Sequence, residues 1–263
     1  MTYPTRQLSV PSSVTPPSPP STAYLACLPG GNGAGLPVDI SGAGAHATRG
    51  ASLSPSALWS TAGAMSSAHT ADSGGVILLP PSVAAVDFSA GESLLVMFEV
   101  FPESGINTNL FGNWPAAGFP GFRATITGGT AFRPSISDGA HNVSVPSNKV
   151  PLTANSWNKF AVGFDGVTKY ISTWSGGVLK NITDASTVTG STVNTTHYMT
   201  LGHGGKRISG TTNDPAASWL VAWRNLHFLK FPSGFGLPGV VQDIVEEWSA
   251  NPGALLTLES VGI

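Results

Sequence analysis

The chain has 263 residues and a formal net charge of −2, and only 10% of its residues are charged. Soluble domains typically carry roughly 25% charged residues. The chain has no basic excess to attract nucleic acid or an anionic membrane, and the composition excludes both as partners. A surface so poor in charge is typical of a protein that packs against neighbours. The length fits one all-β sandwich with terminal extensions.

Residues 1–22 form a Pro- and Ser-rich segment without an alternating apolar pattern. Prolines favour polyproline II or disorder over a packed element. Five of them fall between residues 11 and 20. We expect this segment to be a docking arm that attaches the protein to an assembly, with Tyr3, Leu8 and Val10 as apolar anchors.

The N-terminal region lacks the apolar core of a secretory signal, and no run reaches the roughly 20 apolar residues of a membrane span. We therefore expect the protein to be made in a cytoplasm. A single cysteine, Cys27, lies in an apolar run. It cannot form an intrachain disulfide, and it is expected to be a small buried side chain.

Short apolar runs separated by Gly and Pro predict a series of strands up to residue 145. The run 92–101 is apolar at both alternating sets of positions except Glu99, which predicts a central strand covered on both faces. The stretch 102–121, rich in Gly, Pro and Asn, is expected to be a loop that carries Trp114. The other early strands are expected over residues 23–28, 75–79, 123–127 and 141–145.

The centre of the chain, residues 155–181, has the pattern of three antiparallel strands joined by two tight turns. Phe160, Val162 and Phe164 alternate with polar or small residues, the period of 2 typical of a half-buried strand. Gly176-Gly177 predicts the second turn. This β-meander organises the rest of the predicted fold.

The dipeptide Asp165-Gly166 predicts that the first turn of the meander is a two-residue type I′ turn with Gly166 at positive φ. A turn of this length sets the register of the two strands. It places Phe164 opposite Val167, Phe160 opposite Ile171 and Trp157 opposite Trp174. Lys169 is then the one polar residue on the apolar face.

Further strands and one helix are expected after the meander. Residues 198–202 and 218–231 have strand patterns, the second broken near Asn225, and the Ser/Thr/Val run 183–196 fits one exposed strand or an edge. From residue 240 the apolar residues recur with the spacing of an amphipathic helix. Pro and Gly residues on both sides bound this helix at about residues 239–250.

The meander also resembles a known fold family. A strand opening with Trp157, an Asp-Gly turn, a return strand with Trp174 and a Gly-Gly turn resemble the centre of laminin-G-like jelly rolls, which belong to the concanavalin A-like lectin/glucanase superfamily. The resemblance covers roughly residues 23–231. It implies an all-β antiparallel sandwich jelly roll over residues 23–232, followed by a tail (233–263) with one short C-terminal helix. The fold hosts lectins, hydrolases and structural modules, so it implies no single function.

The sequence lacks the catalytic pattern of the glucanases in this superfamily. Those enzymes carry acidic residues at alternate strand positions, because glycoside hydrolysis needs two facing carboxylates. Here the closest acidic pair, Glu246-Glu247, lies on the predicted helix, and Glu99 stands alone in its strand. No G-x-S-x-G elbow and no zinc-type spacing of His occurs. We expect no enzymatic activity and no cofactor.

Calcium is the one metal that the resemblance leaves open. Laminin-G and lectin sites hold calcium with a few Asp side chains and backbone carbonyls from separate loops. Asp138, Asp165 or Asp214 could serve in this way. The sequence has no dense Asp/Asn cluster, and Asp165 is explained more simply as a turn residue.

Four aromatic residues are candidate glycan contacts: Trp114, Trp157, Tyr170 and Trp174. Trp and Tyr suit a surface that is apolar in its body and wet at one edge, as a sugar site is. In the predicted register the last three share one face of the meander. The sequence favours the alternative, in which they pack beneath a second sheet or a covering loop.

The chain resembles tailed-phage virion proteins in its low charge and its richness in Gly, Ala, Ser, Thr and Pro. It also resembles them in lacking a signal peptide and a set of catalytic residues. This resemblance implies a non-enzymatic structural protein of a virion. Such a protein is made in the host cytoplasm and attached through its arm to other virion proteins and to copies of itself. The alternative is a carbohydrate-binding adhesin or receptor-binding module that recognises a host-surface glycan. An enzyme is the third hypothesis.

Overall fold

The computed structural model describes residues 91–192 and 225–252 apart from short gaps at 103–104, 106, 115–117, 232, 235 and 238–240, together with the backbone of the strands outside these ranges. Residues 1–20 of the predicted arm, with Tyr3, Leu8 and Val10, lie outside the described residues, as do Cys27 and Asp214. Ser21 and Thr22, which the prediction assigned to the arm, are the first residues of a strand.

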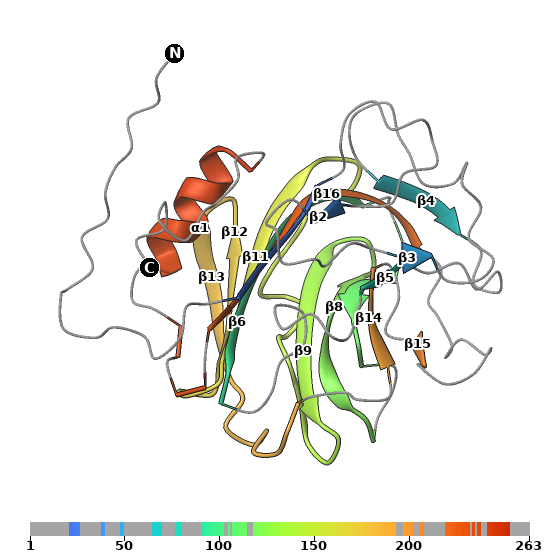
Figure 1. Ribbon diagram of the computed structural model, residues 1–263. Helices are drawn as coiled ribbons and strands as arrows, with labels where there is room; N and C mark the ends of the chain where they lie inside the picture. Colours follow the sequence, from blue (N-terminus) through green and yellow to red (C-terminus); the bar gives the residue numbers. More distant parts are fainter. Residues whose placement is uncertain are drawn as a thin grey trace.

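The described strands form two antiparallel sheets that face each other as a jelly-roll sandwich (Figure 1). In sheet A the order is β13-β12-β11-β6-β16-β1-β2, with β4 paired to β16. Its strands are β13 (Val178–Asp184), β12 (Tyr170–Ser175), β11 (Asn158–Asp165), β6 (Ser93–Pro102), β16 (Trp219–Phe231), β1 (Ser21–Ala26), β2 (Val38–Asp39) and β4 (Met65–His69).

In sheet B the order is β10-β9-β8-β7-β14-β5-β3, with β15 paired to β14. Its strands are β10 (Asn142–Ser144), β9 (Ala131–Asp138), β8 (Pro120–Thr127), β7 (Thr108–Gly112), β14 (His197–Leu201), β5 (Ile77–Leu79), β3 (Thr48–Arg49) and β15 (Lys206–Arg207). The all-β sandwich prediction is confirmed.

The main core lies between the two sheets and is rich in phenylalanine. Phe98 on β6 contacts Phe111 and Phe132 of sheet B edge to face, with ring centroids 5.2 and 5.4 Å apart. Phe132 stacks on Phe160 of β11 at 4.7 Å. β6 lies between β11 and β16, and its residues 93–100 are buried. The prediction of a central strand covered on both faces is confirmed.

β16 is broken where the sequence predicts. Its register against β6 shifts between Arg224 and His227, and Asn225 adopts a φ of 53°. The Asn225 amide donates a hydrogen bond to Glu99 Oε2. Glu99 is therefore a buried, hydrogen-bonded carboxylate of the fold.

Among the described residues one helix, α1 (Val241–Ala250), covers the outer face of sheet A, against β11–β13 in Figure 1. A second apolar cluster fills this interface, made of Leu95, Met97, Ala161, Trp174, Leu229, Phe231, Ile244, Val245 and Trp248. Polar contacts fix the helix in place: the Trp174 indole donates to Gln242 Oε1 (2.7 Å), and the Gln242 amide donates to the Gly177 carbonyl (2.9 Å). The helix prediction is confirmed within two residues.

The β-meander exists, but its predicted register is wrong. Phe164 pairs with Ile171 and Phe160 pairs with Ser175, because the turn spans four residues, 166–169. Asp165 Oδ1 accepts hydrogen bonds from the N–H groups of Val167 and Thr168, each at 2.8 Å, and an Asx turn replaces the type I′ turn.

Gly166 does not have the predicted positive φ; within this turn Lys169 has it, at 60°. Glycine is still required at 166, because a Cβ there would lie 2.0 Å from the Glu92 carbonyl oxygen. The longer turn also takes Lys169 out of the strand, so the polar misfit of the predicted register disappears.

Three other segments differ from expectation. β7 lies inside the predicted loop 102–121, and β9 was not predicted because Pro134 interrupts its pattern. Of the described part of the predicted strand 183–196, residues 183–192, only Thr183 and Asp184 belong to a strand. Residues 185–192 instead form a loop that buries Ala185 and Val188 in the main core.

Candidate binding surface

The edge of sheet A carries the exposed apolar side chains of the described residues. β13 pairs with β12 and ends the strand order of this sheet. The large apolar side chains that are exposed are Val167, Tyr170, Val178, Leu179 and Ile182, with exposed fractions of 41–56%. All five belong to the 166–169 turn, β12 or β13. We call Tyr170, Leu179 and Ile182 the edge surface.

The three side chains of the edge surface lie on the same face of sheet A as helix α1. Trp174 packs under the helix, and alternation along β12 places Tyr170 on the same face. Across the strand pair, Leu179 lies opposite Trp174, and Ile182 lies opposite Ser172. A bulge between Thr173 and Trp174 keeps Leu179 and Ile182 on one face although they are three residues apart.

Polar groups border the edge surface. Asp184 lies opposite Tyr170 on β13, and Lys169 precedes Tyr170 in the turn. An open groove of about 360 Å³ separates the β12–β13 turn from helix α1, lined by Gly176, Gly177, Val178, Glu246, Ser249 and Ala250. This strip of apolar side chains with a polar rim is a typical contact surface for a ligand or a partner.

A small cavity lies at the other end of the meander. Its volume is about 20 Å³, and its lining includes the polar residues Glu92, Asp165, Lys169, Tyr170 and Thr192 together with core residues and glycines. A cavity of this size holds about one water molecule. A sugar bound here would therefore rest on the outer surface of Tyr170 and could not enter the cavity.

The structure places the four predicted glycan contacts in different surroundings. Trp114 and Trp174 are buried, at 3% and 2% exposure, and they offer little surface to a sugar. Trp157 is half-buried and contacts Phe101 edge to face at 5.7 Å. Tyr170 is exposed at 43%. Glycan contact stays a prediction for all four, and Tyr170 is the one with an open ring.

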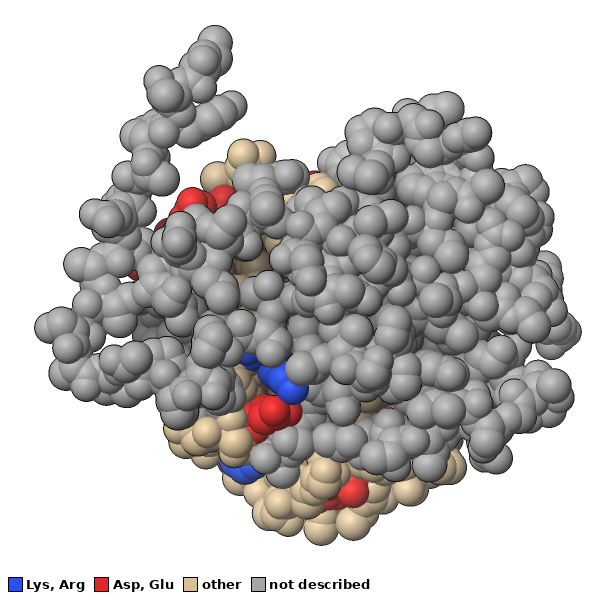
Figure 2. All heavy atoms as spheres, viewed as in Figure 1, with Lys and Arg blue, Asp and Glu red and all other residues tan. Residues whose placement is uncertain are grey.

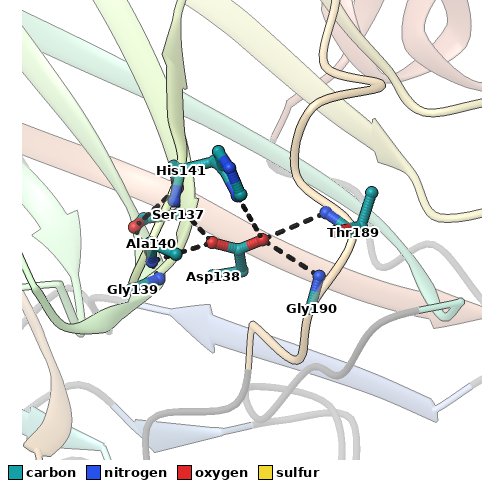
Figure 3. A network of polar contacts seen from close by, with 7 residues as sticks. All are labelled: Ser137, Asp138, Gly139, Ala140, His141, Thr189 and Gly190. Atoms are coloured by element: carbon teal, nitrogen blue, oxygen red, sulfur yellow. Dashed lines mark hydrogen bonds and ion pairs between the residues drawn. The ribbon is translucent and has the colours of Figure 1, made fainter.

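Asp138, one of the calcium candidates, is the centre of a hydrogen-bond network at the β9–β10 turn (Figure 3). Its Oδ1 accepts from the N–H groups of Ala140 and His141, and its Oδ2 accepts from those of Thr189 and Gly190, at 2.7–3.0 Å. The last two bonds attach the 185–192 loop to sheet B.

Opposing effects act on the Asp138 carboxyl. Burial raises its pKa, but backbone hydrogen bonds from His141, Gly190 and Ala140 outweigh this and hold the pKa well below its usual range. Because N–H groups point at both oxygens, this carboxylate serves as a structural acceptor, an environment unlike that of a calcium ligand.

Asp165, the second calcium candidate, also accepts backbone hydrogen bonds at both carboxylate oxygens. Its Oδ1 accepts from the turn, and its Oδ2 accepts from the N–H of Leu237 (3.1 Å). Within the described part of the chain, no three His, Cys, Asp or Glu side chains gather closely enough to hold a metal ion. Calcium binding stays an expectation from the sequence.

The acidic residues that the sequence analysis weighed for glycoside hydrolysis lie in different parts of the fold. Glu99 is buried in sheet A, whereas Glu246 and Glu247 are exposed on helix α1. Asp184, on the edge surface rim, has a lowered pKa because the Ser186 backbone and side chain donate to it. Over the residues that the structure describes, no helix is long and apolar enough to cross a membrane.

Among the described residues visible in Figure 2, uncharged (tan) atoms predominate and the red and blue atoms form small groups. A surface of this kind recognises partners through shape and hydrogen bonds more than through long-range attraction.

No protein-family model matches the chain, and no curated protein matches its sequence. Solved structures do match. The binding domain of botulinum neurotoxin serotype D is 14% identical, with a TM-score of 0.59 over 88% of this chain and 51% of that chain. A structure of botulinum neurotoxin type C, described as depending on two ganglioside molecules for cell entry, is 11% identical, with a TM-score of 0.59 over 89% and 52%.

A third similar structure is the binding domain of botulinum neurotoxin DC in complex with SialylT, 10% identical, with a TM-score of 0.55 over 88% of this chain and 51% of that chain. At such low identity the likeness shows the fold, a lectin-like β-sandwich. The chain spans about half the length of these structures. All three structures come from botulinum neurotoxins, and they give no support to the laminin-G or phage part of the resemblance.

Proposed function

We propose that this protein is a non-catalytic binding module that recognises a cell-surface carbohydrate through the edge surface, with Tyr170 as its central contact. The observation that carries the proposal is the exposed ring of Tyr170 at the start of β12, next to apolar side chains of the end strand β13 and bordered by Asp184 and Lys169. A sugar offers apolar C–H faces and many hydroxyls, so it pairs well with an aromatic ring that has polar neighbours.

The surroundings of Tyr170 favour recognition over catalysis. Its ring is held by a β-strand that is anchored on both faces, by Ile171 in the core and by Trp174 under helix α1, so the contact is presented rigidly. The neighbouring cavity admits about one water and offers no enclosed site for a reacting sugar. Similarity to toxin binding domains supports a binding role at the level of the fold.

The proposal is tested with the full chain on a glycan array. We expect wild type to bind a restricted set of glycans, and Tyr170→Ala to lose that signal without a change in melting temperature. Val167→Ala is the matched control, because Val167 is 49% exposed in the adjacent turn but has no aromatic ring. A wild type that binds no glycan, or a Tyr170→Ala variant that binds like wild type, overturns the proposal.

A second candidate function is assembly, and the exposed β13 favours it. Val178, Leu179 and Ile182 are 41–56% exposed on a strand at the end of a sheet, and such a strand readily pairs with another chain. Under this hypothesis the protein is a structural component of a virion that packs against copies of itself or other virion proteins. Its support is this edge and the low charge of the chain.

Light scattering and sedimentation separate the two candidates. The assembly hypothesis expects oligomers of the purified chain, or its sedimentation with purified virions, and loss of either in Ile182→Lys. A monomer that neither oligomerises nor sediments with virions contradicts assembly and leaves glycan binding as the function of this edge.

A further inference from the structure

A second site lies on the opposite side of the sandwich, on the outer face of sheet B. On β8, Phe122, Ala124 and Ile126 point into the main core, so alternation places Arg123 on the outer face. Trp114 follows β7 and lies against this face. The guanidinium carbon of Arg123 is 4.3 Å from the centroid of the Trp114 ring.

The backbone around this pair makes room for it. Gly112 lies opposite Arg123 on β7, and a Cβ there would come within 2.6 Å of the Arg123 Cβ. Gly121, with a φ of 137°, leaves a similar space, since its Cβ would lie 3.1 Å from that of Trp114. The Asn113 side chain accepts a hydrogen bond from the Phe122 N–H (2.9 Å) and fixes the start of the loop that carries Trp114.

The charge of Arg123 has no counterion among the described residues. Its Nε is buried and makes no hydrogen bond. The other charge at the outward positions of β8 and β9 is Arg133. Burial, and then repulsion from Arg133, lower the pKa of the Arg123 guanidinium. Partly buried charges in proteins are normally paired, because an uncompensated one is costly, and stacking on an indole offsets only part of that cost.

We propose that Arg123 and Trp114 form a binding site for a carboxylate carried by an acidic sugar. A guanidinium presents two parallel N–H groups, a fork that matches the two oxygens of a carboxylate. The Trp114 indole stacked on the guanidinium keeps this planar fork in one orientation. The inference rests on the proposed function only for its ligand class, because the two sites use different sheets.

The experiment compares glucuronate with glucose, which differ in the carboxylate, by titration calorimetry on the full chain. Wild type should bind glucuronate and not glucose at this site. Arg123→Met keeps the apolar stem on Trp114 and should weaken glucuronate binding at least about tenfold, as expected for loss of a hydrogen-bonded charge pair. Arg133→Met is the matched control and should weaken binding by about threefold or less, because an exposed charge acts through screened attraction.

Thermal unfolding gives an independent readout. Glucuronate should raise the melting temperature of wild type but not of Arg123→Met, since a ligand stabilises only a protein that binds it. If Arg123→Met fails to fold, Arg123→Lys serves instead. Lysine keeps the positive charge but lacks the two parallel N–H groups, so Arg123→Lys should lose most of the glucuronate-induced rise in melting temperature.

Two results overturn the inference: no binding of glucuronate by wild type, or equal losses in Arg123→Met and Arg133→Met. Acetate that binds as tightly as glucuronate supports the anion site and overturns the sugar as its ligand. Tyr170→Ala should leave glucuronate binding unchanged, and Arg123→Met should leave array binding of neutral glycans unchanged. These two variants therefore distinguish failure of the Arg123 site from failure of the proposed function.

Discussion

The first and last strands of the meander, β11 and β13, are similar in apolar content but opposite in environment. Phe160, Val162 and Phe164 of β11 are at most 2% exposed, whereas Leu179 and Ile182 of β13 are 41% and 56% exposed. β11 lies between β12 and β6, with the core on one face and helix α1 on the other; β13 has a described partner on one side alone. Position in the sheet, more than composition, separates residues that stabilise the fold from residues free to bind.

The largest expected effect comes from β11. Phe160→Ala removes a fully buried ring that stacks on Phe132, and it should lower the free energy of unfolding by about 3–5 kcal/mol. Chemical denaturation measures this change. Ile182→Ala, the corresponding truncation at the edge, is the control, and equal losses in both variants would show that the two strands do not differ as described.

The second effect is on the pH dependence of the unfolding free energy, and it tests the burial of the outer face of sheet A beneath helix α1. Burial lowers the pKa of His227, which packs against Trp248 of helix α1, to about 3, against an opposing backbone hydrogen bond with Pro252. The unfolded chain has a His pKa of about 6.5 and binds more protons below that pH. Stability is therefore full above about pH 6.5 and falls by up to about 1.4 kcal/mol per pH unit on acidification toward pH 3.

His227→Phe should flatten this part of the pH profile of unfolding free energy, because the replaced side chain no longer titrates. A variant with the same slope as wild type between pH 6.5 and 4.5 would place the acid sensitivity in other groups, and His227 would not be the buried neutral residue described here.

The third effect concerns the turn between β11 and β12. Gly166→Ala should cost about 1–3 kcal/mol, because the new Cβ would overlap the Glu92 carbonyl and force the backbone to shift. Gly176→Ala, at the next turn, has open space around its Cβ but a φ of 59°. A smaller loss is expected there, about 1 kcal/mol, from backbone strain alone. The reverse order of the two losses would contradict close packing at Gly166.

The smallest effect on stability is expected at the edge itself. Leu179→Ser and Ile182→Ser remove exposed apolar surface, and each should change the free energy of unfolding by no more than about 0.5 kcal/mol. Both variants should also be more soluble than wild type. Loss of cooperative unfolding in either one would mean that β13 belongs to the stabilising part of the sheet.

The sequence predicts the periodic elements of this fold well. A run that is apolar at both alternating sets of positions identifies β6, and alternation identifies β11. The break of β16 at Asn225 is visible as a polar residue in an apolar run, and the spacing after residue 240 gives helix α1. These succeed because local pattern and burial agree.

The features of the structure that the sequence does not predict depend on contacts between distant segments. The register of β11 and β12 follows from the way Asp165 bonds the turn and Gly166 meets Glu92. β13 was expected as a strand, but its exposure follows from its place at the end of sheet A. Equally, Trp114 could be found as an aromatic residue, whereas its stacking with Arg123 requires the fold.

The central claim, that the exposed end of the meander is a recognition surface and its centre is structural, is tested most directly by one binding measurement. The affinity of the full chain for its strongest array glycan is compared between wild type and Tyr170→Ala. We predict that the variant keeps the wild-type melting temperature and loses about 30-fold in affinity, the effect of truncating a central aromatic contact of about 2 kcal/mol. Equal affinity of the two proteins would contradict the account.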